Sequence, residues 1–159
     1  YVTTLRRTAE TAAPLAARIG IEPIVEPDLR EVFLGEWEGG RYRQRVAEGD
    51  PLAVRAFREQ EWGVIPGAET TAQLRERVVP ALARIAERHR DQRVIVVTHG
   101  GVIGALLAEA TGSQPWAFVG SDNGSISQLV VTGSRWIVRR YNDTGHLDGE
   151  LSTAAEPPT

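Results

Sequence analysis

The segment R-V-I-V-V-T-H-G-G-V-I-G, residues 93–104, decides the fold class. Its first six residues are largely apolar on both faces of an extended chain, which is typical of a strand at the centre of a parallel sheet covered by helices. The apolar run over 102–111 that follows has the length of a helix and is closed by Gly112. A further helix over 70–90 precedes the strand, with Leu74 and Val78 on its apolar face. A helix, a buried strand and a second helix in this order predict an α/β fold.

The rest of the chain fits the same class. We predict a C-terminal hairpin because S-I-S-Q-L-V-V-T and R-W-I-V-R-R-Y flank Gly133 and Ser134. The expected fold is a three-layer α/β/α sandwich with a mainly parallel sheet and this antiparallel hairpin at its edge. One domain would cover residues 1–147, and the polar, proline-bearing residues 148–159 would form a disordered tail. The other predicted elements are helices at 8–20, 41–48 and 51–60, a short strand at 24–26, a glycine-punctuated loop at 29–40 and a break at 63–68.

Composition excludes several classes of protein. The chain has 159 residues and no cysteine, so disulfides, thiolate zinc sites and a cysteine nucleophile are excluded. Its 18 basic residues are all arginine, but 21 acidic residues give a net charge of −3, which argues against a nucleic-acid partner. Its apolar runs are far shorter than the roughly 18 residues of a membrane span. We expect a cytoplasmic protein with no membrane partner.

His99 follows the central strand and precedes two glycines. In open α/β sheets, ligands bind beyond the carboxyl ends of the strands, where helix N-termini present unpaired N–H groups. Gly100 and Gly101 would let an anion approach the backbone closely. A histidine that merely caps the end of a strand is an equally good interpretation of the spacing alone.

Two further stretches carry groups suited to phosphate chemistry. T-L-R-R-T-A-E-T-A places Arg6 and Arg7 at a strand-to-helix junction, where an arginine could bind phosphate in a bidentate manner. In L-R-E-V-F-L-G-E-W-E-G, the glutamates Glu31, Glu36 and Glu38 lie among aromatic residues, and a carboxyl group beside apolar groups can act as a general acid. Taken separately, each stretch is more simply explained as a solvated helix start or as a glutamate paired with a neighbouring arginine.

Taken together, these stretches resemble the histidine phosphatase superfamily, which has the phosphoglycerate-mutase-like fold. T-L-R-R-T-A-E-T-A is similar to the family motif after the second strand, and L-R-E-V-F-L-G-E-W-E-G to its acid loop. P-G-A-E-T at 66–70 is similar to its P-G-G-E-S helix entry, and V-V-T-H-G-G to its second-histidine motif. The order and the spacing agree from residue 1 to about residue 147.

The resemblance implies a role for each residue of the site. Arg7 would bind the phosphoryl group, His99 would donate to a phosphoryl oxygen, and Glu31 would protonate the leaving alcohol. Backbone N–H groups at Gly100 and Gly101 would complete the phosphate cradle. Bound phosphate would favour protonation of both His99 and Glu31. No metal or cofactor is implied.

The family nucleophile is missing from these residues. Members of the family begin with a strand that ends in Arg-His-Gly, whose histidine forms a phosphohistidine, and the chain has no such motif. His89, His99 and His146 do not match it. Loss of a central strand would leave interior sheet edges unpaired. We therefore expect the native protein to have an upstream segment of at least roughly 30 residues.

The resulting hypothesis is a phosphomonoester hydrolase that acts on a small phosphorylated metabolite. A phosphatase is favoured over a mutase because the stretch from the acid loop to Pro66 is short, whereas a mutase must shield its intermediate from water. The alternative is a catalytically silent member that binds a phosphorylated ligand or a protein partner. A nucleotide-binding module is disfavoured, because H-G-G-V-I-G does not fit G-x-G-x-x-G.

The hairpin edge offers a surface for a homodimer. The candidates for lining the substrate mouth are Phe33, Trp37, Arg41 and Trp62, with Arg43, Arg45 and Phe57 near them.

Overall fold

The computed structural model describes residues 1–147, so the predicted tail at 148–159 lies outside the described residues. Two strands, β1 (Ile126–Thr132) and β2 (Arg135–Asp143), form an antiparallel sheet. The helices are α1 (Arg6–Ile19), α2 (Arg41–Ala47), α3 (Pro51–Glu59), α4 (Thr71–Arg88) and α5 (Gly100–Thr111). Short 3₁₀ turns lie at η1 (Pro27–Leu29), η2 (Gly35–Trp37) and η3 (Trp62–Val64).

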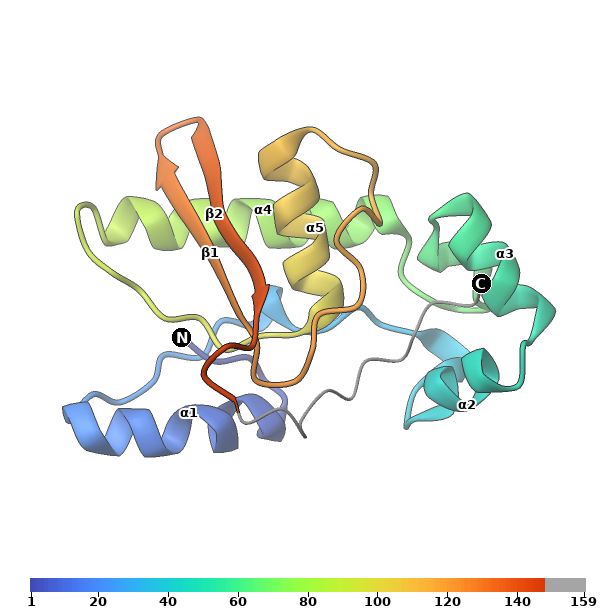
Figure 1. Cartoon of the computed structure of the whole chain (residues 1–159), viewed down its shortest axis with the longest axis horizontal. Helices are drawn as coiled ribbons and strands as arrows, with labels where there is room; N and C mark the ends of the chain where they lie inside the picture. Colours follow the sequence, from blue (N-terminus) through green and yellow to red (C-terminus); the bar gives the residue numbers. More distant parts are fainter. Residues whose placement is uncertain (148–159) are drawn as a thin grey trace.

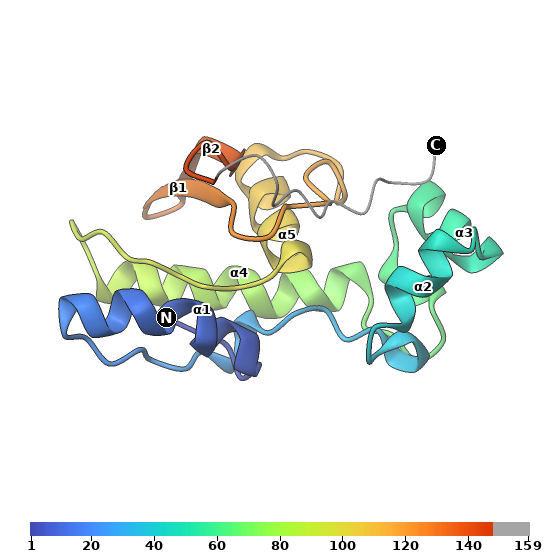
Figure 2. The same cartoon turned by 60° about the horizontal axis from the view of Figure 1, so that its bottom comes forward.

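The helix α4 is the longest helix among residues 1–147. Figure 1 shows α4 along the long axis of the molecule, with α1 below it and with the hairpin and α5 crossing it. Figure 2 shows the hairpin and α5 on one side of α4, with α2 and α3 at the end away from the hairpin. The helix α4 begins at a capping box, in which Thr70 Oγ1 accepts from Gln73 N–H and Gln73 Oε1 accepts from Thr70 N–H.

The predicted parallel sheet is present only as two isolated bridges. Val2 pairs in parallel with Val25 on one side and with Val97 on the other. Backbone hydrogen bonds of 2.8–3.0 Å join these segments, among them Glu26 N–H to Val2 O and Val97 N–H to Tyr1 O. The described residues therefore form an α/β arrangement whose continuous sheet is the antiparallel hairpin, and the expected strands at 24–26 and 93–98 are reduced to these contacts.

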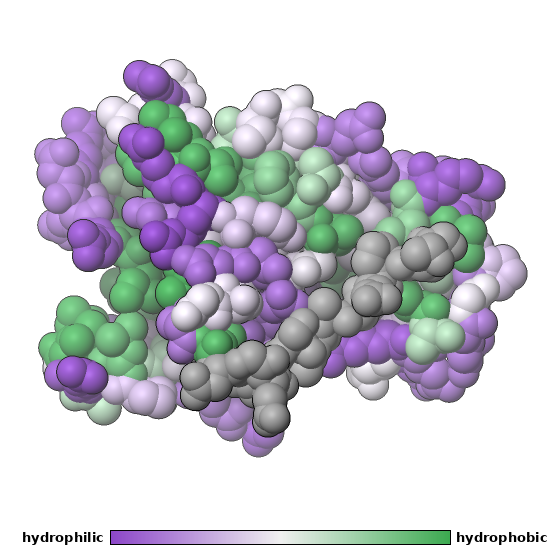
Figure 3. Space-filling model, viewed as in Figure 1, coloured by the Kyte–Doolittle hydropathy of each residue, from purple (hydrophilic) through white to green (hydrophobic). Residues whose placement is uncertain are grey.

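The segment at 93–98 also differs from the expectation in its exposure. It was expected to be covered on both faces, but Ile95 is 51% exposed. Figure 3 shows hydrophobic surface at the end of α1 and in the gap between α1 and the hairpin. Segment 93–98 pairs with residues 1–3 along one edge, and its other edge has no strand among residues 1–147.

The remaining predictions of secondary structure are confirmed within a few residues. The hairpin turns at Gly133 and Ser134, and the predicted helices at 8–20, 41–48, 51–60 and 70–90 correspond to α1 to α4. The buried core lies between α4, α5 and the acid loop, and its fully enclosed side chains include Leu29, Ile65, Leu74 and Val102.

The acid loop turns sharply at Gly35, where φ is +54°. A side chain at this position would begin 2.2 Å from the carbonyl oxygen of Pro66, so the loop depends on glycine both for its conformation and for its contact with residues 66–68. Glu36 N–H donates to the same carbonyl at 3.0 Å.

We expect Gly35→Ala to lower the free energy of unfolding by more than about 2 kcal/mol, because the new methyl group overlaps backbone atoms that cannot move aside cheaply. Gly39→Ala is the matched control: Gly39 has φ +69° but no atom within 4 Å of its would-be Cβ, so it should cost only about 1 kcal/mol of backbone strain. Urea denaturation of both variants measures the difference, and equal losses would contradict this account of the loop.

Candidate active site

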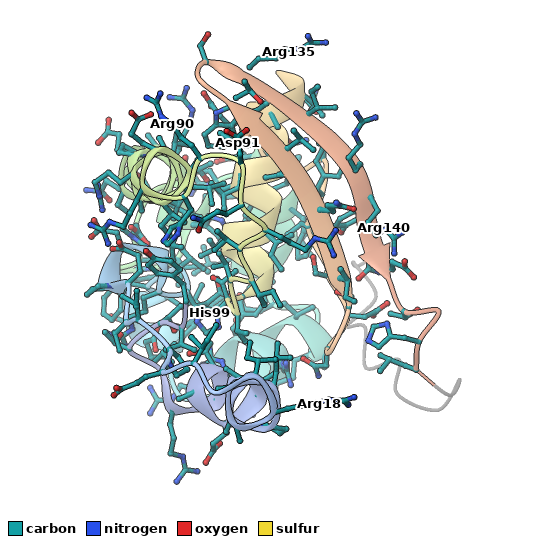
Figure 4. All side chains as sticks on the ribbon, turned by 90° about the vertical axis from the view of Figure 1, so that its left-hand side faces the viewer. Arg18, Arg90, Asp91, His99, Arg135 and Arg140 are labelled. Carbon is teal, nitrogen blue, oxygen red and sulfur yellow. The ribbon has the colours of Figure 1, made fainter. Side chains whose placement is uncertain are left out.

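The candidate site lies at the first turn of α5. His99 occupies the N-cap position of this helix and is buried, with 6% of its surface exposed. Figure 4 shows His99 at the end of α5 that faces α1. The first turn of α1, with Arg7, and the acid loop, with Glu31, converge on the same place. Residues far apart in the sequence thus share one end of the fold, as the α/β prediction implied.

Arg7 and His99 are in direct contact. The Nε–H group of Arg7 donates to Nδ1 of His99 at 3.2 Å, across a separation of 92 residues. Arg6 makes a different contact, an exposed ion pair with Glu10. Of the two neighbouring arginines, Arg7 is therefore the one that faces the histidine.

Two threonines fix the other side of the imidazole. Because Nδ1 accepts from Arg7, Nε2 carries the proton of the neutral ring and donates to Thr3 Oγ1 at 2.9 Å. Thr3 Oγ1 lies 3.2 Å from Thr8 Oγ1, which in turn donates to the carbonyl oxygen of Leu5 at 2.8 Å. Both threonines are buried, so this network holds the ring in one orientation and one tautomer.

His99 is neutral in this arrangement. Burial, followed by the positive charges of Arg7, Arg30 and Arg77, lowers the pKa of His99 to about 4. The site thus presents a neutral histidine among arginines. An anion bound beside them would oppose both effects and would favour the protonated ring.

Glu31 lies against the same helix turn. Its Oε1 accepts from the N–H of Val32 at 2.9 Å, and its Oε2 accepts from the N–H of Gly101 at 3.4 Å. Burial raises the pKa of Glu31, although these two hydrogen bonds and the charges of Arg7 and Arg77 act in the opposite direction. A carboxyl group of this kind can hold a proton at a higher pH than an exposed glutamate, as a general acid requires.

Gly101 admits Glu31 because it has no side chain. A Cβ atom at this position would lie 2.6 Å from Glu31 Oε1. We expected the Gly101 N–H group to donate to phosphate. In this structure it donates to Glu31 instead. A Cβ atom at Gly100, one residue earlier in the same turn, would lie 3.9 Å from its nearest neighbour, the backbone nitrogen of Ser121.

The candidates for lining the substrate mouth divide into two groups. Phe33 is 51% exposed, and Arg41 is exposed and donates to the carbonyl oxygen of Glu36 at 3.3 Å. Trp37 and Trp62 correct the expectation, since each is only 5% exposed. Both belong to the core, where Tyr42 packs against each of them in a tilted arrangement, with ring centroids 6.3 and 5.7 Å away. Large aromatic side chains gain more from this burial than from lining an open mouth.

Three residues around the site were missed by the sequence analysis: Thr3, Thr8 and Arg77. A threonine at each end of a strand-to-helix turn is a local signal for hydroxyl–backbone hydrogen bonds, and it was available for Thr3 and Thr8. No sequence signal connects Arg77 with Glu31, 46 residues earlier, although Arg77 Nη2 donates to the Glu31 carbonyl at 3.2 Å.

Residues 1–147 contain no group of three or more histidine, aspartate or glutamate side chains placed to hold a metal ion. Over the same range, no helix has both the length and the apolar character needed to cross a membrane.

Comparison with known proteins identifies relatives along almost the whole chain. Residues 1–144 match the pattern of the histidine phosphatase superfamily (branch 1). Phosphoglycerate mutase-like protein 4 of Arabidopsis thaliana is 35% identical over 152 residues, and the metal-independent phosphoserine phosphatase of the same plant is 33% identical over 150. The matches cover 93% and 92% of this chain but 65% and 62% of these relatives, so the chain spans slightly less than two thirds of their length.

Solved structures are also similar to this chain over most of its length. Bacillus stearothermophilus YhfR superposes with a TM-score of 0.77 at 28% identity, covering 93% of this chain and 75% of YhfR. A mycobacterial glucosyl-3-phosphoglycerate phosphatase in complex with inorganic phosphate superposes with a TM-score of 0.76 at 29% identity, covering 92% of this chain and 78% of the other.

The low pKa of His99 should make the stability of the protein depend on pH. Between the ordinary histidine pKa of 6.5 and about 4, the unfolded chain binds a proton at His99 that the folded chain does not. The free energy of unfolding should therefore fall as the pH falls through this window, by up to about 3 kcal/mol. Urea denaturation from pH 7 to pH 4 should show a shallower fall in His99→Asn. Glu31, whose raised pKa acts in the opposite direction, is present in both proteins, and parallel curves would contradict the assignment.

Proposed function

The chain belongs to the histidine phosphatase superfamily, and we propose that it hydrolyses phosphomonoesters of a small metabolite through a phosphohistidine intermediate. Its relatives are phosphatases and phosphoglycerate-mutase-like proteins of that superfamily. We further propose that hydrolysis is preferred over phosphoryl transfer between hydroxyl groups.

One observation carries the proposal: Arg7, His99 and Glu31, from three distant parts of the sequence, converge on the first turn of one helix. Arg7 and His99 supply donors of the kind that bind a phosphoryl group, and Glu31 supplies a buried carboxyl group with a raised pKa. A helix N-terminus adds its partial positive charge. The arginine, the histidine and the helix N-terminus favour an anionic phosphate ester over a neutral ligand, and the carboxyl group can supply a proton to its leaving group.

Substrate binding would rearrange the contact between Arg7 and His99. A phosphate dianion offers Arg7 a stronger acceptor than the neutral imidazole, which frees Nδ1 of His99. The dianion would also raise the pKa of His99 from about 4, so that the ring takes up a proton and donates to a phosphoryl oxygen. Binding would therefore consume a proton.

In the first chemical step, a nucleophilic histidine would attack phosphorus and the bond to the leaving oxygen would break. Glu31 would give its proton to that oxygen, so the product leaves as an alcohol and Glu31 becomes a carboxylate. In the second step, water would attack the phosphohistidine and give its proton to Glu31. Inorganic phosphate and the starting form of the enzyme result. Neither step uses a metal or an organic cofactor.

We propose that the nucleophilic histidine is supplied by a further strand beside segment 93–98. The backbone groups of Val94 and Val96 point away from residues 1–3, and no main-chain partner for them exists within residues 1–147. Figures 1 and 4 show the hairpin running along this segment without joining it. A strand between them would cover Ile95 and complete the mainly parallel sheet of a three-layer sandwich.

Hydrolysis is favoured over mutase activity by the short segment that follows the acid loop. Residues 41–59 form two short helices, and Phe33 beside Glu31 is 51% exposed. A mutase must retain its phosphorylated intermediate away from water, which requires more covering structure. Phe33 and Arg41 remain our candidates for contacts with the substrate alcohol. We further propose a cytoplasmic location and, through the hairpin edge, a homodimer.

Glu31→Gln tests the general acid. In the full-length gene product, we expect it to slow hydrolysis of an alkyl phosphate about 10²- to 10⁴-fold, because an alkoxide needs a proton to leave. Hydrolysis of p-nitrophenyl phosphate, whose phenolate leaves without one, should change far less. Steady-state turnover of both esters gives the comparison, and equal slowing would refute the role of Glu31. If the unaltered protein binds vanadate but turns over neither ester, the catalytically silent alternative is correct.

His99→Ala tests the phosphate cradle. Loss of a charge-assisted donor should weaken binding of inorganic phosphate or vanadate by about 10- to 100-fold at pH 7, with the fold retained. His146→Ala is the control, because His146 is exposed and outside the site. Isothermal titration calorimetry measures binding, and circular dichroism verifies folding. Unchanged binding in a folded His99→Ala variant would remove His99 from the site.

A further inference from the structure

We propose that Arg77 is a positioning residue for the general acid: its guanidinium group fixes the backbone of the acid loop so that the Glu31 carboxyl group faces the first turn of α5. This inference rests on the proposed function in giving Glu31 its catalytic role. The contacts that support it are independent of that role.

All five N–H donors of Arg77 have acceptors. Nη1 donates to the carbonyl oxygens of Asp28 and Arg30, both at 2.7 Å, and Nη2 donates to that of Glu31 at 3.2 Å. The remaining two donors bind the Glu69 carboxylate, from Nε at 2.6 Å and from Nη2 at 2.8 Å. An arginine whose donors are all used, three of them on the backbone of one loop, does more than balance a surface charge.

The partner of Arg77 extends the clamp beyond Glu31. Glu69 Oε2 accepts from the N–H of Phe33 at 3.2 Å, and Glu69 N–H donates to the carbonyl oxygen of Phe33 at 2.9 Å. The Arg77–Glu69 pair therefore binds the acid loop on both sides of Glu31. The pair is largely shielded, with side-chain exposures of 24% and 13%, so water competes weakly for these hydrogen bonds.

The clamp acts on Glu31 through the backbone. With its carbonyl oxygen held by Arg77, Glu31 can rotate only about its side-chain bonds, and its carboxyl group is directed to the N–H groups of Val32 and Gly101. A loosened loop would displace the proton donor from the leaving oxygen, and a displacement of about 1 Å can cost about 100-fold in rate. Lysine cannot replace Arg77, because an ammonium group has three donors and no planar fork.

Arg84 provides a matched control from the same helix. It also binds residue 28, but through the Asp28 carboxylate at 2.7 Å, and its side chain is 53% exposed. Removing Arg84 takes away a charge and its ion pairs with Asp28 and Glu26, while leaving the carbonyl contacts of Arg77 in place. Differences between the two variants therefore isolate the backbone clamp from the effect of charge.

The kinetic test compares Arg77→Lys with Arg84→Gln in the full-length gene product. We expect Arg77→Lys to slow hydrolysis of an alkyl phosphate about 10- to 100-fold more than that of p-nitrophenyl phosphate, and Arg84→Gln to slow neither by more than about twofold. In a Glu31→Gln background, Arg77→Lys should have little further effect on the alkyl ester, because both changes remove the same proton transfer. Equal slowing of both esters, or full additivity with Glu31→Gln, would overturn the proposal.

A second measurement does not depend on turnover. The NMR signal of the Gly101 amide should shift with pH as Glu31 ionises, because the two groups are hydrogen-bonded. This shift should shrink by at least about half in Arg77→Lys and persist in Arg84→Gln. A persistent shift in Arg77→Lys would overturn the clamp even in an active enzyme. If Arg77→Lys loses the shift but the unaltered protein has no phosphatase activity, the clamp would be supported and the proposed function refuted.

Discussion

The burial of one carboxyl group against the first turn of α5 constrains the structure around it. Glu31 accepts from two backbone N–H groups there, and the close approach requires a residue without a side chain at Gly101. The loop that carries Glu31 turns at Gly35, where φ is +54°, and its backbone is bound by Arg77, all five of whose donors are used. Burial opposes ionisation of this carboxyl group, and perturbed carboxyl groups of this kind concentrate at functional sites.

Burial shifts the pKa of His99 in the direction opposite to that of Glu31. It is buried among cations and held in a single tautomer by Arg7 and Thr3, so the ligand-free site contains a neutral imidazole. Burial opposes charge on both groups: it lowers the pKa of the histidine and raises that of Glu31. In the proposed function, a bound phosphate dianion would oppose the first effect and reinforce the second, so that both groups would be protonated.

The aromatic residues show how packing can overrule an interpretation based on neighbourhood in the sequence. Trp37 lies in the acid loop and Trp62 follows the short helices, so both were assigned to the substrate mouth. In the structure they enclose Tyr42, and Trp62 also packs against Trp116 with ring centroids 4.2 Å apart. This cluster anchors α2 and α3 to the rest of the core and leaves Phe33 as the exposed aromatic residue of the acid loop.

The sequence by itself determined the helices and the hairpin, but not the parallel strands, which are reduced to isolated bridges among residues 1–147. Apolar periodicity predicted α4, and the turn residues Gly133 and Ser134 predicted the hairpin, because these signals depend on neighbours within a few positions. Motifs selected Arg7, Glu31 and His99. Only the tertiary structure decided that Arg7 donates to His99 and that the Gly101 N–H group donates to Glu31. It also decided that Arg77 binds the backbone of the acid loop. These contacts join residues 46 to 92 positions apart, and such pairs are set by how helices and loops pack in three dimensions, which leaves no periodic trace in the chain.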